Sequence, residues 1–183
     1  MNTVNWFASN GLFEYGILGG LQIDQWGNFN SGFLGGDYYH PKRRYGGPGG
    51  ANEIASLCWR TIIITDQEKR KFVKKPDFIS SPGYLDGSPN ARERAGMPRN
   101  TGPYRVVTGK AMFGYDDETH KMKLLAIAPW VKLEDVLAEM DFEPIMPEHL
   151  EQMVPPTEEE LDILRVAVDP GAQSIAKGEW ITF

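Results

Sequence analysis

The sequence is poor in cysteine and contains no long apolar run. Cys58 is its only cysteine among 183 residues, which excludes an internal disulfide and suits a reducing compartment. No stretch approaches the roughly 20 apolar residues of a membrane span. The N-terminal "MNTVNWFASNGLFEYG" has no basic region ahead of an apolar core, so no signal peptide is expected. We therefore expect a cytoplasmic protein that does not contact membranes.

Positive charge is also scarce, with 19 Lys and Arg against 25 Asp and Glu and a net charge of −6. This balance argues against a general nucleic-acid surface. Two segments are nevertheless basic, "HPKRRY" (40–45) and "DQEKRKFVKK" (66–75), whereas 147–162 is strongly acidic. The basic segments suit either a solvated surface or a small anionic ligand such as a phosphate-bearing cofactor.

Familiar catalytic motifs are missing as well. His40, His120 and His149 are widely separated and have neither HExxH nor zinc-ligand spacing, so no metal site is expected. There is no G-x-S-x-G nucleophile motif. Cys58 lies on the apolar face of an expected helix, which favours a buried structural thiol over a nucleophile.

Glycine, by contrast, is abundant, with 20 residues that fall mostly before Pro103. The segment "YGGPGGANEIASLCWRTIIIT" (45–65) places a glycine cluster before a helix-compatible run (51–58) and a β-branched run (61–65). The β-branched run predicts a strand buried on both faces, as in a parallel sheet. Glycine loop, helix and buried strand together form half of a βαβ unit.

The glycine cluster has two open interpretations. It lacks the Lys-Ser/Thr pair of a Walker A loop and the G-x-G-x-x-G spacing of a dinucleotide site. Its unshielded N–H groups at a helix start could bind a phosphate or a transient oxyanion, or the segment could be a turn without a ligand. Asp24 is the best-placed carboxylate, after a strand end, although an Asx-turn explains it equally well.

The remaining pattern predicts an α/β or mixed-sheet domain over 1–150, with a C-terminal helix and tail over 151–183 packing on it. Thr157 and Glu160 form a capping box that starts the last helix, and Pro170-Gly171 ends it. The other expected elements are a strand at 13–20, a turn at 27–28, a short strand at 77–84, a long loop at 85–104, a hairpin within 105–129 and a helix at 131–140.

Several blocks in order resemble one family. They are "GILGGLQIDQWGNFNS" (16–31), "GPGGANEIAS" (47–56), "EKRKFVKKPDFISSPGY" (68–84), "GPYRVVTGKAMFGYDDETHKMKL" (102–124) and "VKLEDVLAEMDFE" (131–143). Over nearly its whole length the chain resembles β subunits of family I CoA-transferases, especially the glutaconate type. The resemblance implies an α/β fold of the NagB/RpiA/CoA-transferase type. Its mixed, mainly parallel sheet with flanking helices would be incomplete at the N-terminus.

The resemblance also implies an activity, transfer of CoA between an acyl-CoA and a free carboxylate through a glutamyl-CoA thioester (EC 2.8.3 type). Such a chain would act only in complex with a CoA-transferase α subunit, with a CoA thioester as substrate and no tightly bound cofactor. The resemblance implies an oxyanion-hole loop formed by Gly47, Gly49, Gly50 and Ala51. The residues expected to bind substrate are Gln22, Asp24, Asn28, Lys42, Arg43 and Asn52.

One departure from the family leaves alternatives open. The family's nucleophilic glutamate lies in the N-terminal half of the β subunit, which this sequence is expected to lack, and Glu14 is not nominated for that role. The chain could be truncated, one part of a split subunit, or a relative without transferase chemistry. The alternative functions are therefore a CoA-ester hydrolase or decarboxylase on the same scaffold, or a non-catalytic subunit that completes a partner.

Overall fold

The structure is a computed structural model that describes residues 2–170 and 172. Its elements are α1 (Asn2–Ser9), β1 (Tyr15–Leu18), β2 (Gln22–Ile23), β3 (Phe29–Asn30), β4 (Phe33–Gly36), β5 (Pro41–Arg44), α2 (Ala51–Leu57), β6 (Arg60–Ile64), α3 (Ala91–Arg94), β7 (Pro103–Val107), β8 (Ala111–Tyr115), β9 (Met122–Ile127), α4 (Leu133–Ala138), β10 (Glu151–Gln152), α5 (Glu158–Asp162) and the π-helix η1 (Ile163–Val168). No helix within these residues is long and apolar enough to cross a bilayer.

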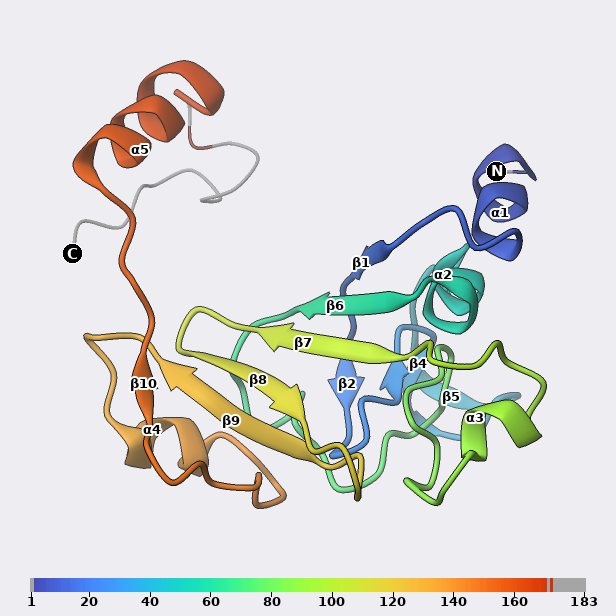
Figure 1. The fold of residues 1–183 in the computed structure, drawn as a ribbon. Helices are drawn as coiled ribbons and strands as arrows, with labels where there is room; N and C mark the ends of the chain where they lie inside the picture. The colour runs from blue at the N-terminus through green and yellow to red at the C-terminus, as the bar shows by residue number, and fades with distance from the viewer. Residues whose placement is uncertain (1, 171, 173–183) are drawn as a thin grey trace. The chain divides into compact units, whose positions relative to one another are not determined.

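The main sheet has the strand order β1-β6-β7-β8-β9-β10 (Figure 1). Strands β1, β6 and β7 are parallel, as are β9 and β10, whereas β8 is antiparallel to both its neighbours. Helix α2 lies in the crossover from β1 to β6, as a parallel pair requires. The predicted mixed, mainly parallel sheet with helices is confirmed.

Helix α2 packs directly on β1 because β1 carries a glycine at the contact. A Cβ added to Gly16 would lie 2.3 Å from the Cγ2 of Ile54 and 3.2 Å from the Sγ of Cys58. Cys58 is a buried free thiol, as the apolar periodicity of the segment predicted. The close approach of helix and strand therefore depends on the missing side chain at position 16.

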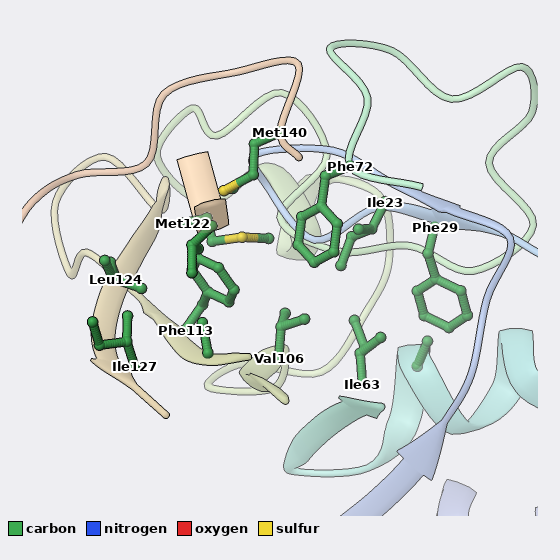
Figure 2. Packing of buried hydrophobic residues seen from close by; sticks show 13 residues of the cluster. Ile23, Phe29, Ile63, Phe72, Val106, Phe113, Met122, Leu124, Ile127 and Met140 are labelled. Atoms are coloured by element: carbon green, nitrogen blue, oxygen red, sulfur yellow. The ribbon is translucent and has the colours of Figure 1, made fainter. Parts of the chain in front are cut away.

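The core lies between the sheet and the segments that cross the face carrying α2. Figure 2 shows Ile63, Val106 and Phe113 pointing from the strands toward Phe72 and its neighbours. The rings of Phe72 and Phe113 lie 5.7 Å apart at 42°, and both side chains are fully buried. These residues alternate along their strands with outward-facing ones, so one face of the sheet supplies the core.

The prediction that strand 61–65 is buried on both faces is wrong for the described chain. Thr61 and Ile63 are buried, but Ile64 on the opposite face is 53% exposed. Ile17 of the neighbouring strand β1 is 64% exposed on that same face. Composition alone predicted a doubly covered strand, whereas the described residues cover only one of its faces.

The predicted strand at 77–84 is also wrong, since only an isolated bridge between Ser81 and Phe29 forms there. The segment is anchored instead by side chains of the β2–β3 region, as Asn28 Oδ1 accepts hydrogen bonds from the amides of Gly83 and Leu85. The predicted loop at 85–104 contains the short helix α3 and ends where β7 begins at Pro103.

The chain divides into two compact units, Met1–Met153 and Val154–Phe183. In the second unit the predicted capping box is confirmed. The Thr157 hydroxyl accepts from the amide of Glu160, and the Glu160 carboxylate accepts from the amide of Thr157. The predicted stop at Pro170-Gly171 and the tail over 173–183 lie wholly or partly outside the described residues. Packing of 151–183 on the first unit stays a prediction.

Candidate functional site

The parallel strands β1, β6 and β7 end at the same edge of the sheet, where ligands of open α/β sheets bind. A hollow of about 500 Å³ lies at this edge. It is lined by Gly19, Gly20, Ile64, Thr65, Asp66, Lys71, Val107, Thr108 and Gly109. None of these residues was predicted as a site residue from the sequence, although several of them directly follow predicted strands.

Polar groups around this hollow are tied to the backbone and to one another. The hydroxyl of Thr65 donates to the carbonyl of Gly20 at 3.4 Å, a long bond that links the ends of β6 and β1. Lys71, with 17% of its side chain exposed, forms an ion pair with the more exposed Asp66. The hollow is therefore lined by glycines and by one ion pair.

Helix α2 ends at the opposite edge of the sheet, where the parallel strands begin. Its last residue, Leu57, is followed within three residues by Arg60, which pairs with Tyr15 at the start of β1. The C-terminus of α2 therefore lies at the beginning of the parallel strands (Figure 1), and no residue of the glycine loop lines the hollow. The glycine loop is therefore a separate candidate site, where the positive end of the helix dipole adds to the loop amides.

The glycine loop forms a tight turn that ends at the N-cap Gly50. Gly47 and Gly49 have φ of +82° and +56°, values that side chains disfavour. A Cβ added to Gly47 would meet no atom within 4 Å, so open space borders the loop. Among the described residues, no acceptor bonds the amides of Gly47, Gly49 or Gly50.

Ala51 differs from the three glycines. Its amide donates to the carbonyl of Pro48 at 2.9 Å and closes the turn. The carbonyl of Gly50 in turn accepts from the amide of Ile54 at 3.1 Å, the first bond of the helix. The predicted set of oxyanion donors therefore needs a correction at Ala51, whose N–H is already used inside the protein, while the glycine amides stay open.

Three predicted substrate-binding residues, Gln22, Asp24 and Asn28, are buried and hydrogen-bonded within the protein. Asn28 donates to Asp24 and to the carbonyl of Leu85 at 2.8 and 2.7 Å. Asp24 also accepts from the amides of Trp26 and Asn28, which makes the Asx-turn that the sequence allowed. Burial raises the pKa of Asp24, and these hydrogen bonds offset part of that effect.

The side chain of Gln22 also links two segments of the chain. Its Oε1 accepts from Asn30 and from the amide of Asp77, and its Nε2 donates to the Asp77 carboxylate at 3.2 Å. Together with Asn28 it fixes the 77–85 segment to the β2–β3 hairpin. The structure thus shows these side chains holding the protein together, and their contact with substrate stays a prediction.

The other predicted substrate-binding residues flank the glycine loop in the sequence. Lys42 and Arg43 lie on β5, which leads into the loop, and both are exposed. The guanidinium of Arg43 lies 5.1 Å from the centre of the Tyr45 ring. Asn52, in the first turn of α2, donates to the carbonyl of Ser80 at 3.1 Å. The six predicted residues therefore fall into a buried network of Gln22, Asp24 and Asn28, a basic strip of Lys42 and Arg43 before the loop, and Asn52 after it.

Arg92, which was not predicted from the sequence as a functional residue, holds α2 in place by hydrogen bonds to its backbone carbonyls. Its guanidinium is 3% exposed and donates to the carbonyls of Gly83 and Ala55 at 2.7 and 2.9 Å, and to the Thr101 hydroxyl at 3.0 Å. Desolvation lowers its pKa to about 10, so it stays charged at neutral pH. Its position in the polar run "NARERAG" gave no signal of burial.

Comparisons with known proteins agree on one family. Residues 3–139 match the family model described as Coenzyme A transferase. The β subunit of glutaconate CoA-transferase from Acidaminococcus fermentans is 43% identical over 155 residues, covering 85% of this chain and 57% of that protein. The cholesterol ring-cleaving hydrolase IpdB subunit of Mycobacterium tuberculosis is 30% identical over 158 residues, covering 84% of this chain and 60% of that protein.

A solved structure agrees in three dimensions. The crystal structure of glutaconate coenzyme A-transferase from Acidaminococcus fermentans matches with a TM-score of 0.88 and 38% identity, covering 96% of this chain and 68% of that chain. This chain spans less than two thirds of the length of both curated relatives. The family model takes in every strand from β1 to β9 and the glycine loop, and the chain therefore belongs to the coenzyme A transferase family.

Proposed function

We propose that this chain is the β-subunit component of a CoA-transferase that moves CoA between an acyl-CoA and a free carboxylate. The reaction passes through a glutamyl-CoA thioester. Each addition to a thioester or acyl carbonyl places negative charge on its oxygen. The proposal rests on one observation, the open glycine amides at the N-terminus of α2.

The amides of Gly49 and Gly50 are the proposed oxyanion donors, with Gly47 leaving the approach clear. Fixed N–H groups that point at developing charge stabilise the transition state without reorganising. Loss of one such donor typically costs about 2.7–4 kcal/mol, or a factor of 10² to 10³ in rate. Ala51 contributes by closing the turn rather than by donating to the substrate.

The basic strip supplies the proposed contacts with CoA. Lys42 and Arg43 are exposed on β5 just before the loop, where they can meet the phosphates of the cofactor portion. Asn52 lies at the same helix start, where its Nδ2 donates to the carbonyl of Ser80 and its Oδ1 is left to accept from the substrate. The buried network of Gln22, Asp24 and Asn28 holds the neighbouring segment in place, so we assign it an indirect part in substrate binding.

The proposed partner is a CoA-transferase α subunit, since the similar proteins are each named as one subunit of a larger enzyme. We assign the nucleophilic glutamate to none of the residues of this chain. The proposed complex therefore combines the glycine loop described above with a carboxylate carried on another segment.

The test is CoA exchange by the assembled complex. The chain is co-expressed with the products of neighbouring genes, and acetyl-CoA formed from glutaconyl-CoA and acetate is measured by mass spectrometry. Gly50→Val should lower the rate at least about 100-fold, because the added side chain blocks access to the amides. Gly46→Val is the control, since a Cβ there meets no atom within 4 Å. Full activity of Gly50→Val would show that the loop is architectural and would favour a non-catalytic subunit.

A CoA-ester hydrolase is the second candidate, since the IpdB relative is named as a subunit of a ring-cleaving hydrolase and this scaffold therefore also serves hydrolysis. The same amides would then stabilise the charge that forms when water attacks a carbonyl. Release of free CoA thiol in the absence of any carboxylate acceptor distinguishes this reaction from transfer. A transferase should release little thiol until acetate is added, and should then form acetyl-CoA in equal amount to the acyl-CoA consumed.

A further inference from the structure

The glycine loop is held at its two ends by hydrogen bonds to neighbouring segments. Within the loop, residues 46–50, no amide donates to an acceptor in the described part of the chain. Before the loop, the amide of Tyr45 donates to the carbonyl of Gly32 at 2.9 Å. After the loop, the Nδ2 of Asn52 donates to the carbonyl of Ser80 at 3.1 Å. The direction of the loop amides therefore depends on how firmly these two acceptors are held.

The hydroxyl of Ser80 joins the two acceptors to each other. Its Oγ accepts from the amide of Ser31 at 2.9 Å and lies 3.0 Å from the hydroxyl oxygen of Ser31. Ser31 directly precedes Gly32, so one side chain ties the segment that holds Tyr45 to the carbonyl that holds Asn52. The glycine loop and these bonds therefore form a closed circuit that passes through the hydroxyl of Ser80.

This hydroxyl is buried and fully bonded. Ser80 is 3% exposed, and its Oγ also donates to the carbonyl of Phe29 at 3.3 Å, so the Ser31 hydroxyl donates to it. One proton given and two bonds accepted use the full capacity of a serine hydroxyl. The adjacent Ser81 is 0% exposed, but its hydroxyl has no hydrogen-bond partner among the described residues. The two neighbouring serines therefore form a matched pair that differs in its bonding toward the loop.

We propose that Ser80 is a positioning residue for the glycine loop. By fixing the acceptors of Tyr45 and Asn52 relative to each other, its hydroxyl sets the direction of the Gly49 and Gly50 amides. The catalytic part of this inference rests on the proposed function, in which these amides stabilise an oxyanion. A donor that is already fixed does not reorganise as charge develops, so loosening the loop should lower kcat more than it raises KM.

The first test follows the loop itself and needs no activity. Ser80→Ala removes the bonds to Ser31 and Phe29, and in the full 183-residue chain the amides of Tyr45 and Ala51 should exchange with deuterium at least about tenfold faster by NMR. Backbone hydrogen bonds between Phe29 and Ser81, at 3.0 and 3.1 Å, should keep the two segments paired in this variant.

Ser81→Ala is the matched control, since it removes a buried hydroxyl without a partner in the described chain and should leave both amides unchanged. The amides of β8, in the interior of the sheet, report any general loss of stability. Asn52→Ala opens the same circuit at an exposed residue and should accelerate exchange at Ala51. Unchanged exchange at Tyr45 and Ala51 in Ser80→Ala, or an equal acceleration throughout β8, would overturn the proposal.

The second test measures CoA exchange in the assembled complex. Ser80→Ala should lower kcat at least about tenfold with little change in KM for the acyl-CoA, whereas Ser81→Ala should change neither. Added to Gly50→Val, Ser80→Ala should cost little more, because the amides that it positions are already blocked. A full further loss in the double variant, or a rise in KM alone, would overturn the positioning role. Absence of exchange by the native complex would instead refute the proposed function, and the deuterium-exchange test would still decide whether Ser80 holds the loop.

Discussion

Gly16 offers the sharpest test of how the glycine loop is positioned. A Cβ in Gly16→Ala would lie 2.3 Å from the Cγ2 of Ile54 and 3.2 Å from the Sγ of Cys58. Carbon atoms pack best at roughly 3.5–4.0 Å, so the first contact overlaps by more than about 1 Å. Helix α2 must move or Ile54 must change rotamer. Overpacking of this kind costs about 1–3 kcal/mol of unfolding free energy.

A double-mutant cycle with Ile54→Ala isolates this clash. Ile54→Ala removes the overlapping methyl group and by itself costs about 2 kcal/mol, the lower end for such truncations, because Ile54 is only partly buried. In the double variant the new methyl group occupies part of the space that Ile54 leaves. The double variant should therefore lose less unfolding free energy than the two single variants lose together, with a coupling energy of about 1–2 kcal/mol.

Urea unfolding followed by circular dichroism measures all four proteins. Gly109→Ala is the control, since a Cβ there meets no atom within 4 Å and the change should stay within about 0.5 kcal/mol. Strictly additive costs for Gly16→Ala and Ile54→Ala would refute the packing of α2 on β1. In an active complex, Gly16→Ala should also slow CoA exchange, because a displaced α2 carries the loop amides with it.

Two further outcomes follow from buried charge. Arg92→Leu should cost at least about 3 kcal/mol in urea unfolding, because the carbonyls of Gly83 and Ala55 lose their donor, and a loss below about 1 kcal/mol would contradict this role. Burial raises the pKa of Asp24 above its unfolded value of 3.8, so the folded state holds the proton more tightly. The unfolding free energy of the native chain relative to Asp24→Asn should therefore fall as pH rises from 3.8 through the folded pKa, and a flat difference would contradict it.

Local signals predicted the elements that depend on neighbouring residues. The β-branched run at 61–65 became β6, the periodic run at 51–58 became α2, and the capping box at Thr157 formed as expected. Each of these signals acts within about four residues, through side-chain sterics or a cap hydrogen bond. For the same reason, the glycine loop could be placed at a helix start from the sequence.

The predictions were wrong where residues far apart in the sequence determine the local structure or the burial of a side chain. The 77–84 segment has strand-like composition, but Asn28 and Gln22 hold its backbone by side-chain hydrogen bonds across about 55 positions. The burial of Arg92 was invisible because its acceptors lie in α2 and in the 82–83 turn. The exposure of Ile64 could not be foreseen because composition does not reveal which face of a strand is covered.

By itself, the sequence determined the glycine loop, the βαβ order and the family, because each is written in short ordered blocks of residues. Only the tertiary structure decided which loop amides stay open, since the carbonyl of Pro48 takes the amide of Ala51 but leaves those of the glycines. It also decided that Asp24 and Asn28 serve as internal anchors and that the described residues leave one face of β1 and β6 exposed. These properties depend on contacts between residues far apart in the chain, which pattern and propensity cannot specify.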